Sequence, residues 1–153
     1  MVLLMLGEGQ GLADEDHIVR YVPWTKLLKD EDDNVLGFLP QAFELRPDEE
    51  SLSVNWLEFF SGDRSEKKRQ AIQAFRASVK VGKKSAFGIA NVGEVKDTCL
   101  SSGARVRIVY MPEENNASHA LIKHLPRTEL ALFEALATTA FSELVQNTAV
   151  PED

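Results

Sequence analysis

Hydrophobic and polar residues alternate over short runs in the first half of the chain. His17–Val22 alternates apolar with polar side chains, which predicts a strand that ends at Pro23. Residues 52–55 predict a second short strand, and prolines, glycines and acidic turns interrupt the sequence between these runs. We therefore expect an irregular first half, in which short elements are joined by many turns.

The second half of the chain predicts longer and more regular elements. Residues 65–79 place Ile72, Phe75 and Val79 at spacings of three to four residues, which is typical of an amphipathic helix. The other predicted elements are a buried strand over 85–92, a short helix over 94–101, a half-buried strand over 104–110, a helix over 117–125 and a long amphipathic helix over 128–147 with Thr128 as its N-cap.

The order of these elements predicts the fold class. A succession of strand, helix, strand, helix and strand over 52–110 is typical of βαβ-like units, whose strands pair in parallel through right-handed crossovers. The helix over 94–101 is short for such a crossover, so we expect a mixed sheet. We therefore predict an α+β fold: a single domain over 17–148 with a small mixed sheet, βαβ-like units in its second half and a long C-terminal helix. Residues 1–16 are predicted as a flexible N-terminal arm and 149–153 as a tail.

Composition agrees with a folded domain and excludes several classes of protein. The 153 residues are 44% hydrophobic and 27% charged, near globular averages, which excludes wholesale disorder. A single cysteine, Cys99, excludes an intramolecular disulfide framework and a zinc site built from cysteines, and we expect a buried, inert thiol. The apolar run 1–6 is too short to cross a membrane and lacks the basic region of a secretory signal. We therefore expect a cytoplasmic protein without a membrane partner.

Charge is distributed unevenly along the chain. The net charge of −7 is the sum of −10 over residues 1–63, +8 over 64–107 and −5 over 108–153. Such asymmetry is evidence about partners and self-association rather than about fold. One interpretation is that acidic and basic surfaces face each other within the domain. The other is that these surfaces bind partners of opposite charge.

The basic residues gather on and after the predicted helix over 65–79. Arg69, Arg76 and Lys80 fall on one helical face, and Lys83 and Lys84 follow directly. Phosphate backbones bind such stripes through counterion release, which makes an anionic ligand or a nucleic acid a candidate for residues 64–84. Docking against an acidic patch, of this chain or of a partner, is the alternative.

Large aromatic residues accompany the acidic residues of the first half. Core packing explains most of them, but irregular acidic segments with tryptophan anchors also form protein-binding surfaces. We therefore add Trp24 and Trp56 to the candidate binding residues, which are Arg69, Arg76, Lys80, Lys83, Lys84, Trp24 and Trp56.

The histidines do not have the spacing of metal ligands. His119 and His124 are five residues apart, and a helical pair of ligands would need three or four, so we predict no metal and no cofactor. His119 remains the candidate catalytic residue, as a general acid or base. It follows a polar loop and is expected at a helix start, where the helix N-terminus would disfavour the imidazolium and bind an anion. The phosphate ligands in that interpretation are Arg69, Arg76, Arg105 or Arg107.

Two glycines, Gly88 and Gly93, stand at a predicted strand-to-helix junction. The segment lacks the lysine and hydroxyl residue of a P-loop and the full dinucleotide-binding pattern. A tight turn and close packing explain both glycines, and a phosphate cradle is the alternative.

Several short segments resemble a set of uncharacterised bacterial proteins of similar length. These segments are Tyr21-Val22-Pro23-Trp24, residues 30–35, residues 40–43 and Leu52-Ser53-Val54-Asn55-Trp56-Leu57-Glu58. The resemblance runs over most of the chain. It implies a bacterial origin, and it carries over neither an activity nor a functional residue.

Three functions are compatible with these observations. We favour a small accessory protein that binds a protein partner, in a defence system or as an inhibitor of an effector, because acidic surfaces bind basic partners and no catalytic motif is present. A nucleotide- or RNA-acting enzyme that uses His119 is the first alternative. Nucleic-acid binding without catalysis, through the basic residues 64–84, is the second.

Overall fold

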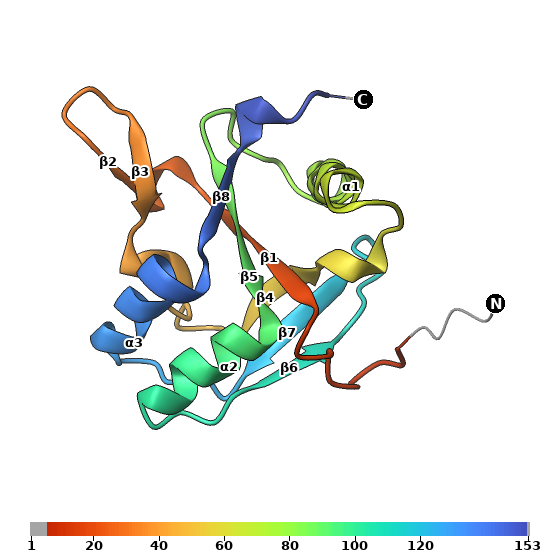
Figure 1. Cartoon of the computed structure of the whole chain (residues 1–153), viewed down its shortest axis with the longest axis vertical. Coiled ribbons are helices and arrows are strands. Elements are labelled where there is room, and N and C mark those ends of the chain that lie inside the picture. Colours follow the sequence, from red (N-terminus) through yellow and green to blue (C-terminus); the bar gives the residue numbers. More distant parts are fainter. Residues whose placement is uncertain (1–5, 153) are drawn as a thin grey trace.

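The computed structural model describes residues 6–152, and a six-stranded antiparallel sheet forms its centre (Figure 1). Its strands, in the spatial order β6-β7-β4-β1-β5-β8, are β1 (His17–Val22), β4 (Ser51–Trp56), β5 (Ala86–Asn91), β6 (Arg107–Tyr110), β7 (His119–Lys123) and β8 (Glu143–Gln146). A separate hairpin consists of β2 (Leu27–Lys29) and β3 (Val35–Phe38).

Helices and short turns join these strands. Within residues 6–152 the α-helices are α1 (Arg64–Ser78), α2 (Val92–Ser101) and α3 (Leu130–Ala135), and α3 continues into a π-helical turn, η4 (Leu136–Ala140). The 3-10 turns are η1 (Trp24–Lys26), η2 (Pro40–Phe43), η3 (Leu57–Phe59) and η5 (Asn147–Ala149). These elements confirm the predicted α+β class and a helix in the C-terminal part of the chain.

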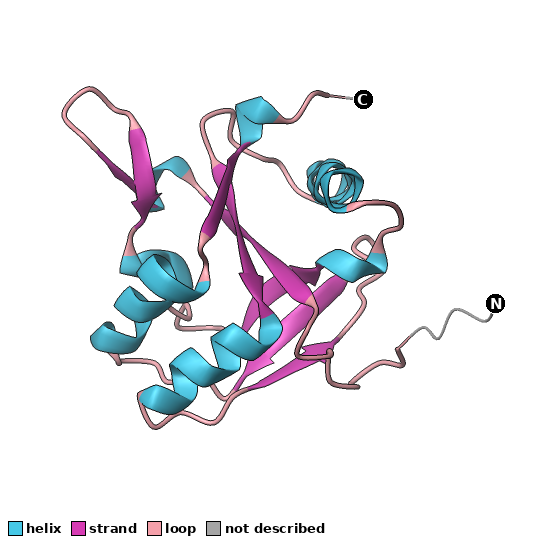
Figure 2. Cartoon of the chain, viewed as in Figure 1, coloured by secondary structure: helices cyan, strands magenta, loops and turns pink. Residues whose placement is uncertain are grey.

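Helices cover both faces of the sheet (Figure 2). On one face, Ile72 of α1 packs in a cluster with Val19 and Phe87. On the other face, Ile18 and Val22 belong to the larger cluster, which α2, α3 and η4 complete. Successive side chains of a strand point to opposite faces, so β1 buries apolar residues on both of its sides.

The strand pairing differs from the prediction. Every ladder is antiparallel, so the predicted parallel pairing and mixed sheet are wrong. β4 and β5, which α1 joins, do run in the same direction, but β1 lies between them and pairs antiparallel with each. The βαβ-like units are therefore split. The order of elements predicts their direction, whereas adjacency depends on a strand from the other half of the chain.

Two predicted helices also differ from the structure. Residues 117–125 contain β7 instead of a helix, because pairing with β4 and β6 and the complete burial of Ala120 and Ile122 outweigh helical propensity. The helix predicted over 128–147 has Glu129 at its N-cap instead of Thr128, and its π-helical end is reached at Ala140. The chain then turns, and β8 pairs with β5, which is otherwise an edge strand.

Within the described part of the predicted arm, residues 6–16, residues 9–12 lie along β6, while residues 1–5 lie outside the described residues. The N–H of Gly9 donates to the carbonyl of Tyr110 at 2.7 Å, and the N–H of Leu12 donates to that of Ile108 at 2.9 Å. Leu12 is buried in the larger core cluster. These bonds cover the outer edge of β6.

The same segment binds the start of α2. The N–H groups of Val92 and Gly93 donate to the carbonyls of Asp16 and Asp14, at 2.8 and 2.9 Å. A Cβ atom at Gly93 would lie 3.2 Å from the carbonyl oxygen of Asp14, so close packing accounts for this glycine. The N–H groups that a phosphate cradle would use are thus bonded within the chain.

Gly88 allows aromatic rings to rest on β5. A Cβ atom at this position would lie 2.9 Å from Cζ of Phe38 and 3.2 Å from Cδ2 of Phe141. Phe38 comes from the hairpin and Phe141 follows η4, so this contact fixes both on the sheet.

We expect Gly88→Ala to lower the free energy of unfolding by about 1–3 kcal/mol, because the added methyl group displaces packed aromatic rings. Urea denaturation measures this change. Gly37→Ala is the matched control, because a Cβ atom at Gly37 meets no heavy atom within 4 Å. Equal stability of the two variants would contradict the packing role of Gly88.

Candidate functional site

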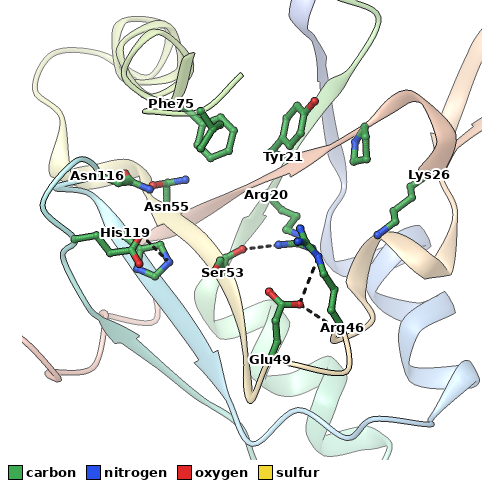
Figure 3. Close-up of a pocket in the computed structure, with 13 residues that line it drawn as sticks. Arg20, Tyr21, Lys26, Arg46, Glu49, Ser53, Asn55, Phe75, Asn116 and His119 are labelled. Carbon is green, nitrogen blue, oxygen red and sulfur yellow. Dashed lines mark hydrogen bonds and ion pairs between the residues drawn. The ribbon is translucent and has the colours of Figure 1, made fainter. Parts of the chain in front are cut away.

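A hollow opens where β1 and β4 diverge. The two strands pair only at Ile18–Trp56 and Val19–Asn55. Beyond these pairs β1 follows β5 and β4 follows β7. Arg20 bridges the opening, because its Nη1 donates to the carbonyl of Ser53 at 2.8 Å and its Nε donates to the carbonyl of Ala42 at 3.1 Å. We call this hollow the β1–β4 fork (Figure 3).

The fork is a cavity of about 350 Å³. Its walls come from β1 with η1, the loop before β4, β4 itself, the C-terminal half of α1, and the turn between β6 and β7. Cationic side chains, aromatic side chains and a polar group with His119 occupy three different parts of the wall (Figure 3).

Three cations converge on the fork. Arg20, Lys26 and Arg46 point toward one another in Figure 3. Burial lowers the pKa of the Arg20 guanidinium from its usual range to about 10, with a smaller opposing effect of Glu49. Burial and the positive charges of Arg20 and Arg46 lower the pKa of Lys26. Like charges held together in this way are stabilised by a bound anion.

The carboxylate of Glu49 offsets part of this charge. Its Oε1 accepts a hydrogen bond from the N–H of Arg46 at 2.9 Å and lies 3.9 Å from Nε of the same residue. Because three cations stand against the carboxylates of Glu44 and Glu49, the cationic wall keeps an excess of positive charge.

His119 lies on the opposite wall with Asn55 and Asn116 (Figure 3). It is 6% exposed and begins β7, so the expectation that it begins a helix, with a helix N-terminus beside it, is wrong. Its Nδ1 lies 2.8 Å from the carbonyl oxygen of Met111, which can only accept, so Nδ1 carries the hydrogen. Nε2, the nitrogen without a backbone partner, lies 3.8 Å from Oε1 of Glu113.

The third part of the wall is aromatic. The rings of Tyr21 and Phe75 are 5.3 Å apart between centroids, and both line the fork. The hydroxyl oxygen of Tyr21 accepts from the N–H of Gly82 at 3.0 Å, which fixes the ring. Tyr21 and Phe75 thus give the cavity an apolar surface of fixed geometry.

The residues that charge patterning singled out lie elsewhere. Arg76 donates five hydrogen bonds to Asn147, Val150 and Pro151 and so holds the C-terminal segment against α1. Arg69, Lys80, Lys83 and Lys84 are exposed, as are Arg105 and Arg107. The cavity lining includes none of these seven residues.

Part of the basic segment is neutralised within the fold. The carboxylate of Glu143 in β8 lies 2.8 Å from Nη2 of Arg64 and 2.6 Å from Nζ of Lys68. This pairing agrees with the interpretation in which acidic and basic surfaces of one chain face each other.

The two candidate tryptophans differ in environment. Trp24 is half-buried, with Nζ of Lys29 at 4.0 Å and Nζ of Lys84 at 5.4 Å from its ring centroid, so the structure does bring Trp24 and Lys84 together. Trp56 is buried, and its indole N–H donates to Asp16 at 2.9 Å.

Sequence reasoning missed Arg20, Lys26 and Arg46 because they lie in the acidic part of the chain. They are three of the four basic residues within residues 1–63. A signal for one of them exists: Arg20 alternates with Ile18 and Val22, both completely buried, and therefore places a charge on an apolar face of the strand.

Cys99 is buried in α2, as expected, and burial raises the pKa of its thiol to about 11. Within residues 6–152, no cluster of histidine, cysteine and acidic residues could hold a metal ion, and no helix has the length and apolar character needed to span a membrane.

Comparisons with protein-family models, curated proteins and solved structures find no match to the chain.

We expect Glu143→Gln to lower the free energy of unfolding by about 1–2 kcal/mol near neutral pH, because Arg64 and Lys68 lose their shared carboxylate. Burial alone would raise the pKa of Glu143, but hydrogen bonds from Lys68 and Arg64 and their charges bring it below its ordinary 4.5. The stabilisation is thus present above that value and is lost as the pH falls through the lower pKa of the folded state.

Urea denaturation across the acidic range measures this effect. The difference between the wild-type protein and Glu143→Gln should shrink once the pH falls below 4.5. Glu134→Gln is the control, because Glu134 is exposed and has no ion pair among the described residues. A difference that stays constant with pH would contradict the role of the carboxylate charge.

Proposed function

We propose that the protein binds a small phosphorylated molecule in the β1–β4 fork. The observation that carries this proposal is the convergence of Arg20, Lys26 and Arg46 on one cavity, where the carboxylates of Glu44 and Glu49 offset only part of their positive charge. Guanidinium groups donate paired hydrogen bonds to phosphate, and an ammonium group adds a mobile point charge. Burial and the charges of Arg20 and Arg46 lower the pKa of Lys26, and a phosphate in this position would offset the repulsion between these cations.

The other walls favour a ligand with a planar, partly apolar body. Tyr21 and Phe75 provide a stacking surface, while Asn55, Asn116 and His119 provide hydrogen-bonding groups. The cavity volume of about 350 Å³ lies within the range typical of small-molecule sites. A nucleoside monophosphate combines a phosphate, a polar sugar and a planar base, and it is the ligand class that we propose.

Nucleic-acid binding through α1 receives less support. Arg64 and Lys68 are paired with Glu143, and the donors of Arg76 are bonded to the C-terminal segment.

The location that we propose is the cytoplasm, where a buried, unpaired thiol such as Cys99 stays reduced.

Isothermal titration calorimetry with AMP tests the proposal. We expect Lys26→Gln and Arg46→Gln each to weaken AMP binding by about 5- to 10-fold, because each removes one charge-assisted contact with the phosphate. Both side chains reach solvent, so these variants keep the fold better than a change at Arg20 would. Adenosine, which lacks the phosphate, should bind more weakly than AMP.

Lys83→Gln is the charge-matched control, because Lys83 is exposed and does not line the fork. Its affinity for AMP should equal that of the wild-type protein. If AMP does not bind, or if Lys83→Gln weakens binding as much as Lys26→Gln does, the proposed site is refuted.

Proton transfer at His119 is a second candidate function. One observation favours it: the Met111 carbonyl fixes the hydrogen on Nδ1, which leaves Nε2 of a buried imidazole as a base in the wall of the fork. In that case His119 would take a proton from a water molecule that attacks a bound phosphodiester.

The p-nitrophenyl ester of thymidine 5′-monophosphate is a suitable substrate for this test. We expect release of p-nitrophenolate, and we expect His119→Gln to lower kcat by about 100-fold or more with little change in KM, because the base is lost and the phosphate ligands remain. Absence of turnover, or unchanged turnover in the variant, would leave the fork a binding site without this chemistry.

A further inference from the structure

One edge of the six-stranded sheet is covered by other residues of the chain, and the opposite edge is open. Residues 9–12 cover the outer edge of β6, with a bridge between Gly11 and Val109. β8 forms the other edge, and no strand within residues 6–152 pairs with its outer side. An uncovered edge strand presents N–H and C=O groups that another chain can pair with.

The alternation of hydrogen bonds along the β5–β8 ladder shows which backbone N–H and C=O groups of β8 face away from β5. The N–H of Asn147 donates to the carbonyl of Ser85 at 2.9 Å, which makes this a hydrogen-bonded pair. Such pairs alternate in an antiparallel ladder, so Glu143 and Val145 bond to β5. The backbone groups of Leu144 and Gln146 therefore face the open side.

An apolar groove lies beside the N-terminal end of this edge. It has a volume of about 290 Å³, and Leu28 and Leu36 of the hairpin line it together with Phe141 and Leu144. Leu36 is 62% exposed and Leu28 is 45% exposed, and they are two of the five large apolar residues that are exposed in the described chain. Leu144 belongs both to the groove and to the open edge, so the two features are continuous.

The C-terminal end of the edge lies near the acidic turn of the same hairpin. Asp33 and Asn34 line a second hollow with Gln146 and Thr148. Asp30 is used within the turn, since hydrogen bonds from the side chain and N–H of Asn34 lower its pKa. Glu31, Asp32 and Asp33 are exposed and form no ion pair within residues 6–152.

Lys84 is the cation of this second hollow, and its Nζ lies over the ring of Trp24. Nζ of Lys29 lies over the same ring and donates to the carbonyl of Trp24 at 2.7 Å. Three carboxylates without an ion pair in the described chain thus lie near two ammonium groups, both of which are held against Trp24, so the turn keeps an excess of negative charge that is complementary to a basic partner.

We propose that the open edge of β8, with the groove at Leu28 and Leu36, binds an extended basic segment of a partner protein. The segment adds a strand to β8 through the backbone of Leu144 and Gln146 and places apolar side chains in the groove. Lysine or arginine side chains of the segment meet Glu31, Asp32 and Asp33. This surface is separate from the fork, so the inference does not depend on the proposed ligand.

A display library of random peptides of about twelve residues, selected against the whole protein, tests this inference. We expect enriched peptides that combine alternating apolar residues with lysine or arginine. An enriched peptide should slow hydrogen exchange at the amides of Leu144 and Gln146, as measured by NMR. Leu36→Ser should weaken its binding by about fivefold or more, since an exposed anchor is lost.

Control variants separate the contributions to this surface. Leu100→Ser removes another exposed leucine, on α2, and should leave peptide binding unchanged. The triple variant Glu31→Gln, Asp32→Asn, Asp33→Asn should weaken binding and reduce its dependence on salt. Circular dichroism of each variant verifies that the fold is kept.

Three results would overturn the inference. One is enrichment of peptides without a basic excess, and another is binding that Leu36→Ser does not affect. The third is a dimer in analytical ultracentrifugation that Leu36→Ser dissociates, which would show that a second copy of this chain covers the edge. Loss of AMP binding in the fork variants would not bear on this result, because Lys26 and Arg46 line neither the groove nor the open edge of β8.

Discussion

The position of β1 between β4 and β5 is the constraint on which the rest of the structure depends. Both neighbours pair with β1 in antiparallel orientation, so β4 and β5 run in the same direction. The helix α1 connects them across one face of the sheet, and α2 leads from β5 to β6 across the other. Because each face of β1 is then covered, its side chains are buried in both core clusters. A strand in this position cannot be displaced without unpairing the centre of the sheet.

The fork follows from the short pairing of β1 with β4. Where the two strands separate, carbonyl groups of β4 lose their partners in the sheet, and a buried carbonyl without a partner is costly. Arg20 provides donors to Ser53 and Ala42 and thereby brings a positive charge to the centre of the fold. The same interaction that closes the gap in the sheet creates the cationic wall to which Lys26 and Arg46 contribute.

The charge asymmetry of the chain has two structural outcomes. Glu143 and the C-terminal carbonyls engage Arg64, Lys68 and Arg76, so much of the basic helix supports the fold. The acidic turn of the hairpin remains free of ion pairs within the described residues, next to exposed leucines. Acidic side chains without an ion pair in the described chain thus remain on the hairpin, which is the surface that we propose for a partner.

The sequence by itself determined the elements whose cause is local. The capping box of Asp63 and Glu66 and the apolar spacing of Ile72 and Phe75 define α1, and the alternation of residues 17–22 defines β1. The α+β class and the burial of Cys99 also follow from local pattern and composition.

Only the tertiary structure decided which strands are neighbours, because pairing depends on contacts between distant segments. It made residues 119–123 a strand, ended the C-terminal helix at Ala140, and placed His119 opposite Arg20 rather than beside Arg69 or Arg76. A cavity is assembled from side chains of five segments, and the separation of two strands has no local signature. For that reason only the elements with local causes were predictable from the sequence, and the site was not.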